Sequence, residues 1–139
     1  FLIFIILLGV SFVSSCGPNR QDADAKLKES CLEALRSVYE SNDTVEPQET
    51  SFESKTTEDG DKLRVVKIRA YYSHDKGMIE EKNYSCSFSE TRDFFGYQAH
   101  FYSMDRAGVK YGTFDGVAEG DFNDLLRLNA ILDHVMGGS

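Results

Sequence analysis

Cysteine, histidine and carboxylate side chains are the groups in this sequence that could carry chemistry. The spacing of the cysteines and histidines argues against thiol catalysis and metal binding. Three cysteines occur without a CxxC motif, and no histidine has a recognisable spacing to Cys31 or Cys86, so we predict no catalytic thiol. His74, His100 and His134 fall in a predicted turn, strand and helix end, and no pair has the spacing of metal ligands. The sequence therefore indicates a protein that is not an enzyme and holds no metal or other cofactor.

The carboxylates are numerous, and their excess restricts the partners of the protein. Asp and Glu number 23 against 15 Lys and Arg, for a formal net charge of -8. Such a surface repels phosphate backbones and releases no counterions, so we expect no nucleic-acid partner and no adhesion to anionic lipid through a basic patch. The acidic turns TTEDGD and DGVAEGD do not match a calcium-binding loop. A hydrolase with two paired carboxylates remains an alternative, because sequence does not show which carboxylates meet in space.

The start of the chain differs in composition from everything after it. Residues 1–13, FLIFIILLGVSFV, form an apolar run that is too short to cross a bilayer, which takes about 20 residues of helix. The next letters complete the run VSSC at Val13–Cys16, which resembles the lipobox of bacterial lipoprotein signal peptides. The positively charged start of such a signal is missing ahead of Phe1. A transmembrane anchor and a buried strand are the alternatives for this segment.

The lipobox resemblance implies a location and a division of the chain into parts. The cysteine of a lipobox is acylated and the signal is cleaved ahead of it, so Cys16 is predicted to fasten the protein to a membrane of the bacterial cell envelope. The expected parts are a signal peptide at 1–15, the lipidated cysteine and a short tether at 16–22, and a single domain at 23–139. Gly17 in place of Asp after the cysteine implies, for a Gram-negative cell, the periplasmic face of the outer membrane.

The domain is predicted to begin with a helix and to continue as strands. Apolar residues at spacings of three and four predict a helix over Asp24–Tyr39. Segments of alternating residues then predict about five strands, with a bulge where the alternation slips at Val65 and Val66. The predicted strands are Thr50–Ser54, Leu63–Tyr72, Met78–Ser89, Tyr97–Met104 and Val109–Phe114.

A second helix is predicted at the C-terminal end. Asp121 suits its N-cap and Gly137 suits the position after its last turn. Its apolar stripe consists of Leu125, Leu128, Ile131, Leu132 and Val135. The short connections make the sheet antiparallel, so the predicted fold class is α+β: about five antiparallel strands, with an N-terminal and a C-terminal helix packed on one face.

Cys31 and Cys86 each lie on an apolar surface of this predicted fold. Cys31 belongs to the helix stripe, and Cys86 shares a strand face with Tyr84 and Phe88, so both should point into the layer between helix and sheet. In an oxidising compartment a Cys31–Cys86 disulfide is expected, with two separate buried thiols as the alternative. That pairing leaves Cys16 as the odd cysteine, which favours its lipidation.

Aromatic residues gather around the fourth predicted strand. Their alternation favours core packing over a ligand groove. The gathered residues are Phe94, Phe95, Tyr97, Phe101 and Tyr102. His100 and Tyr102 are the exposed partners in that alternation and form our candidate binding surface.

The whole chain resembles small bacterial lipoproteins of uncharacterised function, whose soluble part is a helix with an antiparallel sheet. Within that group, the run VVKIRAYYSHDKGMIEEKNYSCSFS resembles a hairpin that lies beside a cysteine-bearing helix. We expect a membrane-anchored envelope lipoprotein that is not an enzyme and that binds another protein or a cell-wall component. The alternatives are a small-molecule or inhibitor-type binding module that uses its sheet face, in the manner of cystatin-like folds, and the carboxylate hydrolase.

Overall fold

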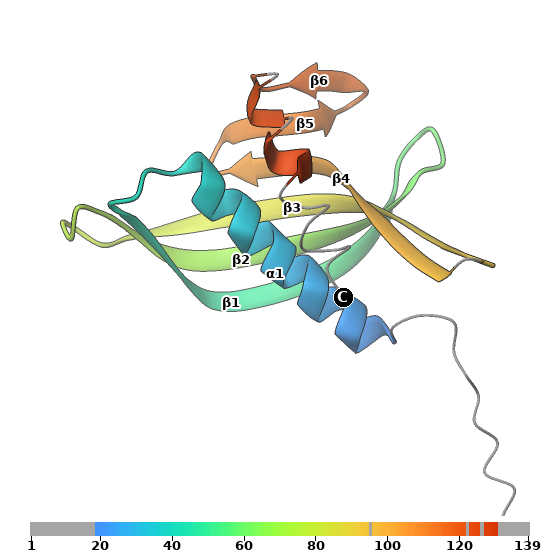
Figure 1. The fold of residues 1–139 in the computed structure, drawn as a ribbon, viewed down its shortest axis with the longest axis horizontal. Helices are drawn as coiled ribbons and strands as arrows, with labels where there is room; N and C mark the ends of the chain where they lie inside the picture. Colours follow the sequence, from blue (N-terminus) through green and yellow to red (C-terminus); the bar gives the residue numbers. More distant parts are fainter. Residues whose placement is uncertain (1–18, 95, 122, 126, 131–139) are drawn as a thin grey trace, which may run out of the picture.

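A long helix lies across one face of a six-stranded antiparallel sheet (Figure 1). The computed structural model describes residues 19–94, 96–121, 123–125 and 127–130. The strands follow one another in space as they do in sequence, so each pairs with the next through a short connection. The elements are α1 (Arg20–Val38), β1 (Asp43–Thr56), β2 (Lys62–His74), β3 (Glu80–Asp93), β4 (Gly96–Arg106), β5 (Val109–Phe114) and β6 (Val117–Glu119).

The predicted α+β fold with two helices and about five strands is wrong, because the described residues form mainly a sheet of six strands, with α1 as the one long helix among them. A sixth strand, β6, occupies a segment that looked like a loop, and it pairs with β5. Of the second helix, only 123–125 and 127–130 lie within the described residues, and Gly137 lies outside them. Its predicted start is observed, since the side chain of Asp121 accepts a hydrogen bond of 2.8 Å from the backbone N–H of Asn123.

The first helix begins and ends close to the predicted residues. The side chain of Asn19 caps it by accepting a hydrogen bond of 2.8 Å from the backbone N–H of Asp22. One stripe of α1 is completely buried against the sheet, on the positions Ala23, Leu27, Ser30, Cys31, Ala34 and Leu35. The helix therefore supplies most of the apolar cover of this sheet face.

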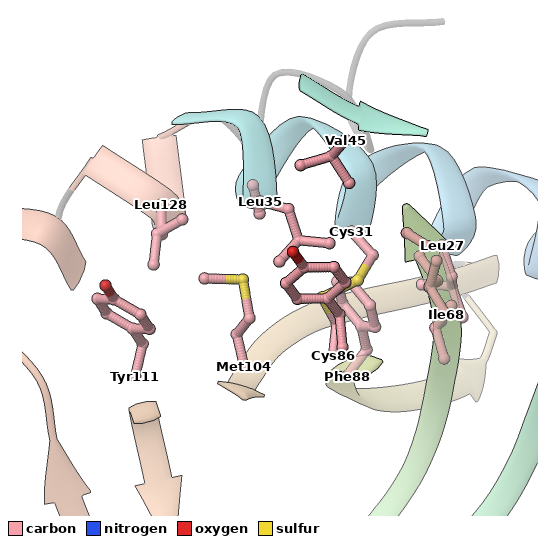
Figure 2. Packing of buried hydrophobic residues seen from close by; sticks show 14 residues of the cluster. Leu27, Cys31, Leu35, Val45, Ile68, Cys86, Phe88, Met104, Tyr111 and Leu128 are labelled. Atoms are coloured by element: carbon pink, nitrogen blue, oxygen red, sulfur yellow. A yellow bond between two sulfur atoms is a disulfide. The ribbon is translucent and has the colours of Figure 1, made fainter. Parts of the chain in front are cut away.

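A single core joins the helix to the sheet (Figure 2). At its centre Cys31 of α1 and Cys86 of β3 form the predicted disulfide, with their Cα atoms 5.8 Å apart. Around it pack Leu27, Ile68 and Phe88, each at most 1% exposed. Leu128, in the helical residues 127–130, joins the same core and points toward Tyr111.

Bulges shift the strand register at two positions, neither of them at Val65 and Val66. The β1–β2 register shifts between Pro47 and Glu49, and the β3–β4 register shifts beside Tyr102. Val65 and Val66 instead continue the regular pairing of β2 and point to opposite faces of the sheet, and both are buried.

Gly112 makes room for the second bulge. A Cβ atom at this position would overlap the carbonyl oxygen of Tyr102, and its backbone has a φ of +96°. A side chain at Gly112 is therefore excluded both by the close approach of β4 and by the left-handed backbone.

Replacing both Cys31 and Cys86 with Ala should lower the free energy of unfolding by about 4 kcal/mol, the loop-closure entropy for cysteines 55 residues apart. Urea unfolding followed by circular dichroism measures this loss. Reducing agent should shift the wild type toward the double variant and leave the double variant unchanged. Mass spectrometry of the protein under non-reducing conditions should find the two cysteines in one linked peptide; free thiols at both positions would contradict the bond.

Candidate functional site

The predicted site residues fall in separate parts of the molecule. Cys16 lies outside the described residues. Cys31 and Cys86 are buried in the disulfide and have a structural role. His100 pairs with Ser89 and is exposed on the sheet face away from α1, whereas Tyr102 is half-buried at the β4 bulge. Whether His100 and Tyr102 bind anything stays a prediction.

A different group of side chains gathers at the C-terminal end of α1, and we call it the tyrosine cluster. It consists of Tyr39, Tyr72, Tyr84 and Arg106. The Tyr39 ring stacks on Tyr72 with centroids 5.0 Å apart, and the hydroxyl groups of Tyr39 and Tyr84 are hydrogen-bonded at 2.9 Å. The Arg106 guanidinium lies 4.8 Å from the centroid of the Tyr39 ring and donates a hydrogen bond of 3.1 Å to the carbonyl of Val38. The last turn of α1 is thereby capped from β4.

Asp43 connects the tyrosine cluster to the base of the β2–β3 loop. One of its carboxylate oxygens accepts a hydrogen bond of 2.8 Å from the Tyr72 hydroxyl and lies 2.6 Å from Nδ1 of His74. The other accepts a hydrogen bond of 2.8 Å from the backbone N–H of Glu40. Asp43 therefore joins the α1–β1 connection to the end of β2.

These contacts change the proton affinities of the groups involved. The hydrogen bond with His74 lowers the pKa of Asp43, and the same bond raises the pKa of His74. The hydrogen bond to Asp43 raises the pKa of Tyr72 to about 12, and burial raises the pKa of Tyr84. At neutral pH both phenols are therefore protonated, which makes them poor bases and poor nucleophiles, and the Tyr72 hydroxyl donates its hydrogen bond to Asp43.

An apolar surface adjoins this end of the molecule, and we call Tyr71, Met78 and Ile79 the distal patch. Met78 is 80% exposed, Ile79 67% and Tyr71 41%. The sequence predicted Met78 in a strand, but β3 begins only at Glu80. Met78 and Ile79 belong instead to the β2–β3 loop, and Tyr71 lies on β2. Tyr71 pairs with Glu81, two residues after Ile79, so the three exposed side chains belong to one end of the β2–β3 hairpin, and exposed apolar patches are typical of protein-binding surfaces.

The backbone of the β2–β3 loop is held by hydrogen bonds. The N–H of Asp75 donates to the carbonyl of Asn42 at 2.9 Å, and the N–H of Gly77 donates to the carbonyl of His74 at 2.9 Å. Asp75 and Lys76 have φ angles of 50° and 55°, which turns the chain sharply ahead of Met78. The distal patch is thus presented by a defined turn that rests on the Asp43–His74 contact.

The opposite end of α1 carries a network of ion pairs. Arg20 contacts Asp24 at 2.7 Å and Glu90 at 2.5 Å, and Arg64 also pairs with Asp24, at 2.7 Å. The Tyr97 hydroxyl donates a hydrogen bond of 2.6 Å to Glu90. This network fastens the first turns of α1 to β2, β3 and β4.

The same network holds two carboxylates close together, since Asp24 and Glu90 contact one nitrogen of Arg20. Burial would raise the pKa of each carboxyl group, but hydrogen bonds from Arg64 to Asp24 and from Arg20 to Glu90 outweigh it and lower both. A glycosidase-type pair needs one carboxyl group that stays protonated as a general acid. Two carboxylates held ionised by arginine count against that chemistry.

Two of the hollows on the described surface are open to solvent, and the second adjoins the ion-pair network through Arg20 and Asp24. A polar one of about 430 Å³ lies on the sheet face away from α1 and is lined in part by Lys67, Arg69 and Asn83. A mainly apolar one of about 600 Å³ lies between the start of α1 and Phe52. The polar hollow is the feature that a ligand-binding sheet face would use.

In the described ranges, no three His, Cys, Asp or Glu side chains come close enough together to hold a metal ion. Comparisons with protein-family models, with curated proteins and with solved structures give no significant match to this chain in any of the three. There is consequently no relative from which site residues could be carried over.

Replacing His74 with Gln should remove a pH-dependent part of the stability. Because the pKa of His74 is raised in the folded protein, its contact with Asp43 contributes fully below the usual pKa of about 6.5. The contribution is lost as the pH rises through the folded pKa, so the wild type should lose stability relative to His74→Gln from about pH 6.5 upward. Urea midpoints measured across this range test the expectation.

His100→Gln is the matched control, because it removes an exposed imidazole from β4 and leaves Asp43 untouched. It should follow the wild-type pH profile. Parallel profiles for the wild type and His74→Gln would show that the contact with Asp43 does not stabilise the fold.

Proposed function

We propose that this chain is a lipid-anchored lipoprotein of the bacterial cell envelope that is not an enzyme and binds another protein through its distal patch. The anchor is supported by the apolar run 1–13 and by the VSSC motif that ends in Cys16. The Cys31–Cys86 disulfide adds support of a different kind, because disulfides persist in oxidising compartments outside the cytoplasm. Among the described residues, no helix has both the length and the apolar character needed to cross a membrane.

The observation that carries the proposal is the placement of the distal patch relative to the tether. The residues after Cys16 lead into the start of α1, and the helix runs 19 residues, or about 28 Å, to the end where Tyr39 packs on Tyr72. Met78 and Ile79 belong to the loop at that far end (Figure 1). A protein held at Cys16 would therefore present its exposed apolar loop away from the bilayer.

The chemistry of the distal patch favours a protein over a sugar polymer. Met78 and Ile79 offer apolar side chains without hydrogen-bonding groups, and sugars are bound mainly through polar groups. Methionine is also common at adaptable protein-binding surfaces. The acidic domain adds a charge preference, since a net charge of -8 favours association with a basic partner.

A second candidate function rests on the polar hollow of the sheet face away from α1. Lys67, Arg69 and Asn83 present charged and amide groups there, suited to a small polar ligand or a cell-wall fragment. Arg69, however, already contacts Glu49 at 3.0 Å and Glu81 at 3.3 Å. A ligand would have to compete with both carboxylates, so this function ranks second.

Replacing Cys16 with Ala should abolish labelling of the protein by radioactive palmitate and release it into the soluble fraction of the cell. The reason is that the thiol of Cys16 is the only group in the lipobox that accepts the lipid. Ser15→Ala keeps a small residue and the thiol, and it should remain labelled and membrane-bound. Continued labelling of Cys16→Ala would refute the lipid anchor.

A photoreactive amino acid at Ile79 should crosslink in intact cells to a partner of one defined mass. Adding Met78→Ser should reduce that adduct roughly tenfold, the loss expected when a central apolar contact is removed from an interface. The same photoreactive group at Val117 of β6, which is 58% exposed, is the matched control and should give no such adduct. Equal adducts from both positions would exclude the distal patch as a specific binding surface.

A further inference from the structure

Two short runs of the sequence have the form of an acceptor for N-linked glycosylation. Residues 40–44 read ESNDT and residues 81–85 read EKNYS, so Asn42 and Asn83 are each followed by one residue other than proline and then by Thr or Ser. In both runs a glutamate lies two residues before the asparagine. Such short motifs also arise by chance, so the structure has to decide which asparagine a transferase can reach.

Asn42 lies in the exposed turn that connects α1 to β1. It precedes the first residue pair between β1 and β2, which joins Asp43 to His74, so it lies outside the strand ladder. Thr44, the hydroxyl residue of the motif, is also exposed, and it belongs to the edge strand of the sheet, where only one side is paired. A transferase can therefore approach Asn42 and Thr44 from solvent.

The turn around Asn42 is held by hydrogen bonds that do not involve its side-chain amide. The carbonyl oxygen of Asn42 accepts a hydrogen bond of 2.9 Å from the backbone N–H of Asp75. The carboxylate of Asp43 accepts one of 2.8 Å from the backbone N–H of Glu40. The turn is thus defined by its backbone and by Asp43, while the amide group that would receive a sugar is not needed to hold it.

The second motif is built into an inner strand of the sheet. Asn83 itself is exposed, but Tyr84 is only 2% exposed, and Ser85 is half-buried and paired on both sides, with β2 and with β4. The next residue, Cys86, forms the disulfide with α1. A transferase would have to detach β3 from its neighbours to bind this motif, so the folded protein does not offer Asn83 as an acceptor.

We propose that Asn42 carries an N-linked glycan and that Asn83 of the folded protein does not. The amide nitrogen of Asn42 attacks the anomeric carbon of an oligosaccharide that is carried on a lipid diphosphate. The bond between that carbon and the nitrogen forms, the bond between the carbon and the diphosphate oxygen breaks, and the lipid diphosphate leaves. The amide gives one proton to a base of the transferase. The inference rests on the export that the proposed function requires, but not on the lipid anchor or on the distal patch.

A glycan on Asn42 would lie at the same end of the molecule as the distal patch. The hydrogen bond between Asn42 and Asp75 joins the α1–β1 connection to the β2–β3 loop, which carries Met78 and Ile79, and both connections lie at one end of the sheet (Figure 1). Glycans are bulky and hydrophilic. The sugar would therefore limit the directions from which a partner protein approaches the patch.

Mass spectrometry of the protein purified from the cells that produce it tests the inference, because trypsin, used after reduction of the disulfide, separates the two asparagines. Asn42 falls in the peptide 37–55 and Asn83 in the peptide 83–92. We expect peptide 37–55 to carry the added mass of a glycan and to release sugar fragment ions, and peptide 83–92 to have its unmodified mass. Thr44→Ala should abolish the modification although Asn42 is retained. Thr44→Ser keeps the hydroxyl group, so it is the matched control and should remain glycosylated.

The outcomes separate this inference from the proposed function. An unmodified peptide 37–55 from protein in which Cys31 and Cys86 are linked would refute the glycan, because the disulfide shows that the chain reached an oxidising compartment. Glycans on both peptides would refute the selection of Asn42 by the fold. Palmitate labelling of the same preparation reports the anchor: labelled protein without a glycan refutes only this inference, and glycosylated protein without label refutes only the anchor. Reduced cysteines together with an unmodified peptide 37–55 would refute both, since both require export.

Discussion

The bond between Cys31 and Cys86 is the constraint on which the rest of the structure depends, because it fixes the middle of α1 to the third strand of the sheet. A single central bond would let the helix pivot over the sheet. The ion pairs of Arg20 at one end and the stacked ring of Tyr39 at the other prevent that rotation. The direction of α1 is therefore defined, and with it the separation between its first turn and the distal patch.

Charged and aromatic groups at both ends of α1 tie the helix to the sheet. Asp24 and Glu90 are held ionised by arginines, and the Tyr72 and Tyr84 hydroxyls are held protonated. Each such group is the partner of another side chain, which lowers the cost of placing it beside the core. The apolar side chains left exposed next to these clusters are the ones that offer binding energy. The two ends thus differ in chemistry, since one carries stacked tyrosine rings and the other a network of ion pairs.

Sequence patterns predicted the elements that bury side chains at regular intervals. They missed segments that are strands only because their backbone is hydrogen-bonded to a neighbouring strand. The stripe of α1 and the alternation of β2 and β3 are clear, so these elements and the disulfide were found. In β1 only Val45 is buried, and its length comes from backbone bonds to β2, which leave no pattern in side chains. The tyrosine cluster joins residues far apart in sequence, and the distal patch lacks any periodicity. Neither could be found before the strand register was known.

Strand β1 is the edge of the sheet and runs 14 residues, long enough to template pairing with another chain. Its middle lacks that ability, because Pro47 offers no N–H group and the register shift that follows bends the strand. At the other edge, β6 is only 3 residues long. A second chain that approached either edge would therefore find few consecutive backbone groups with which to extend the sheet.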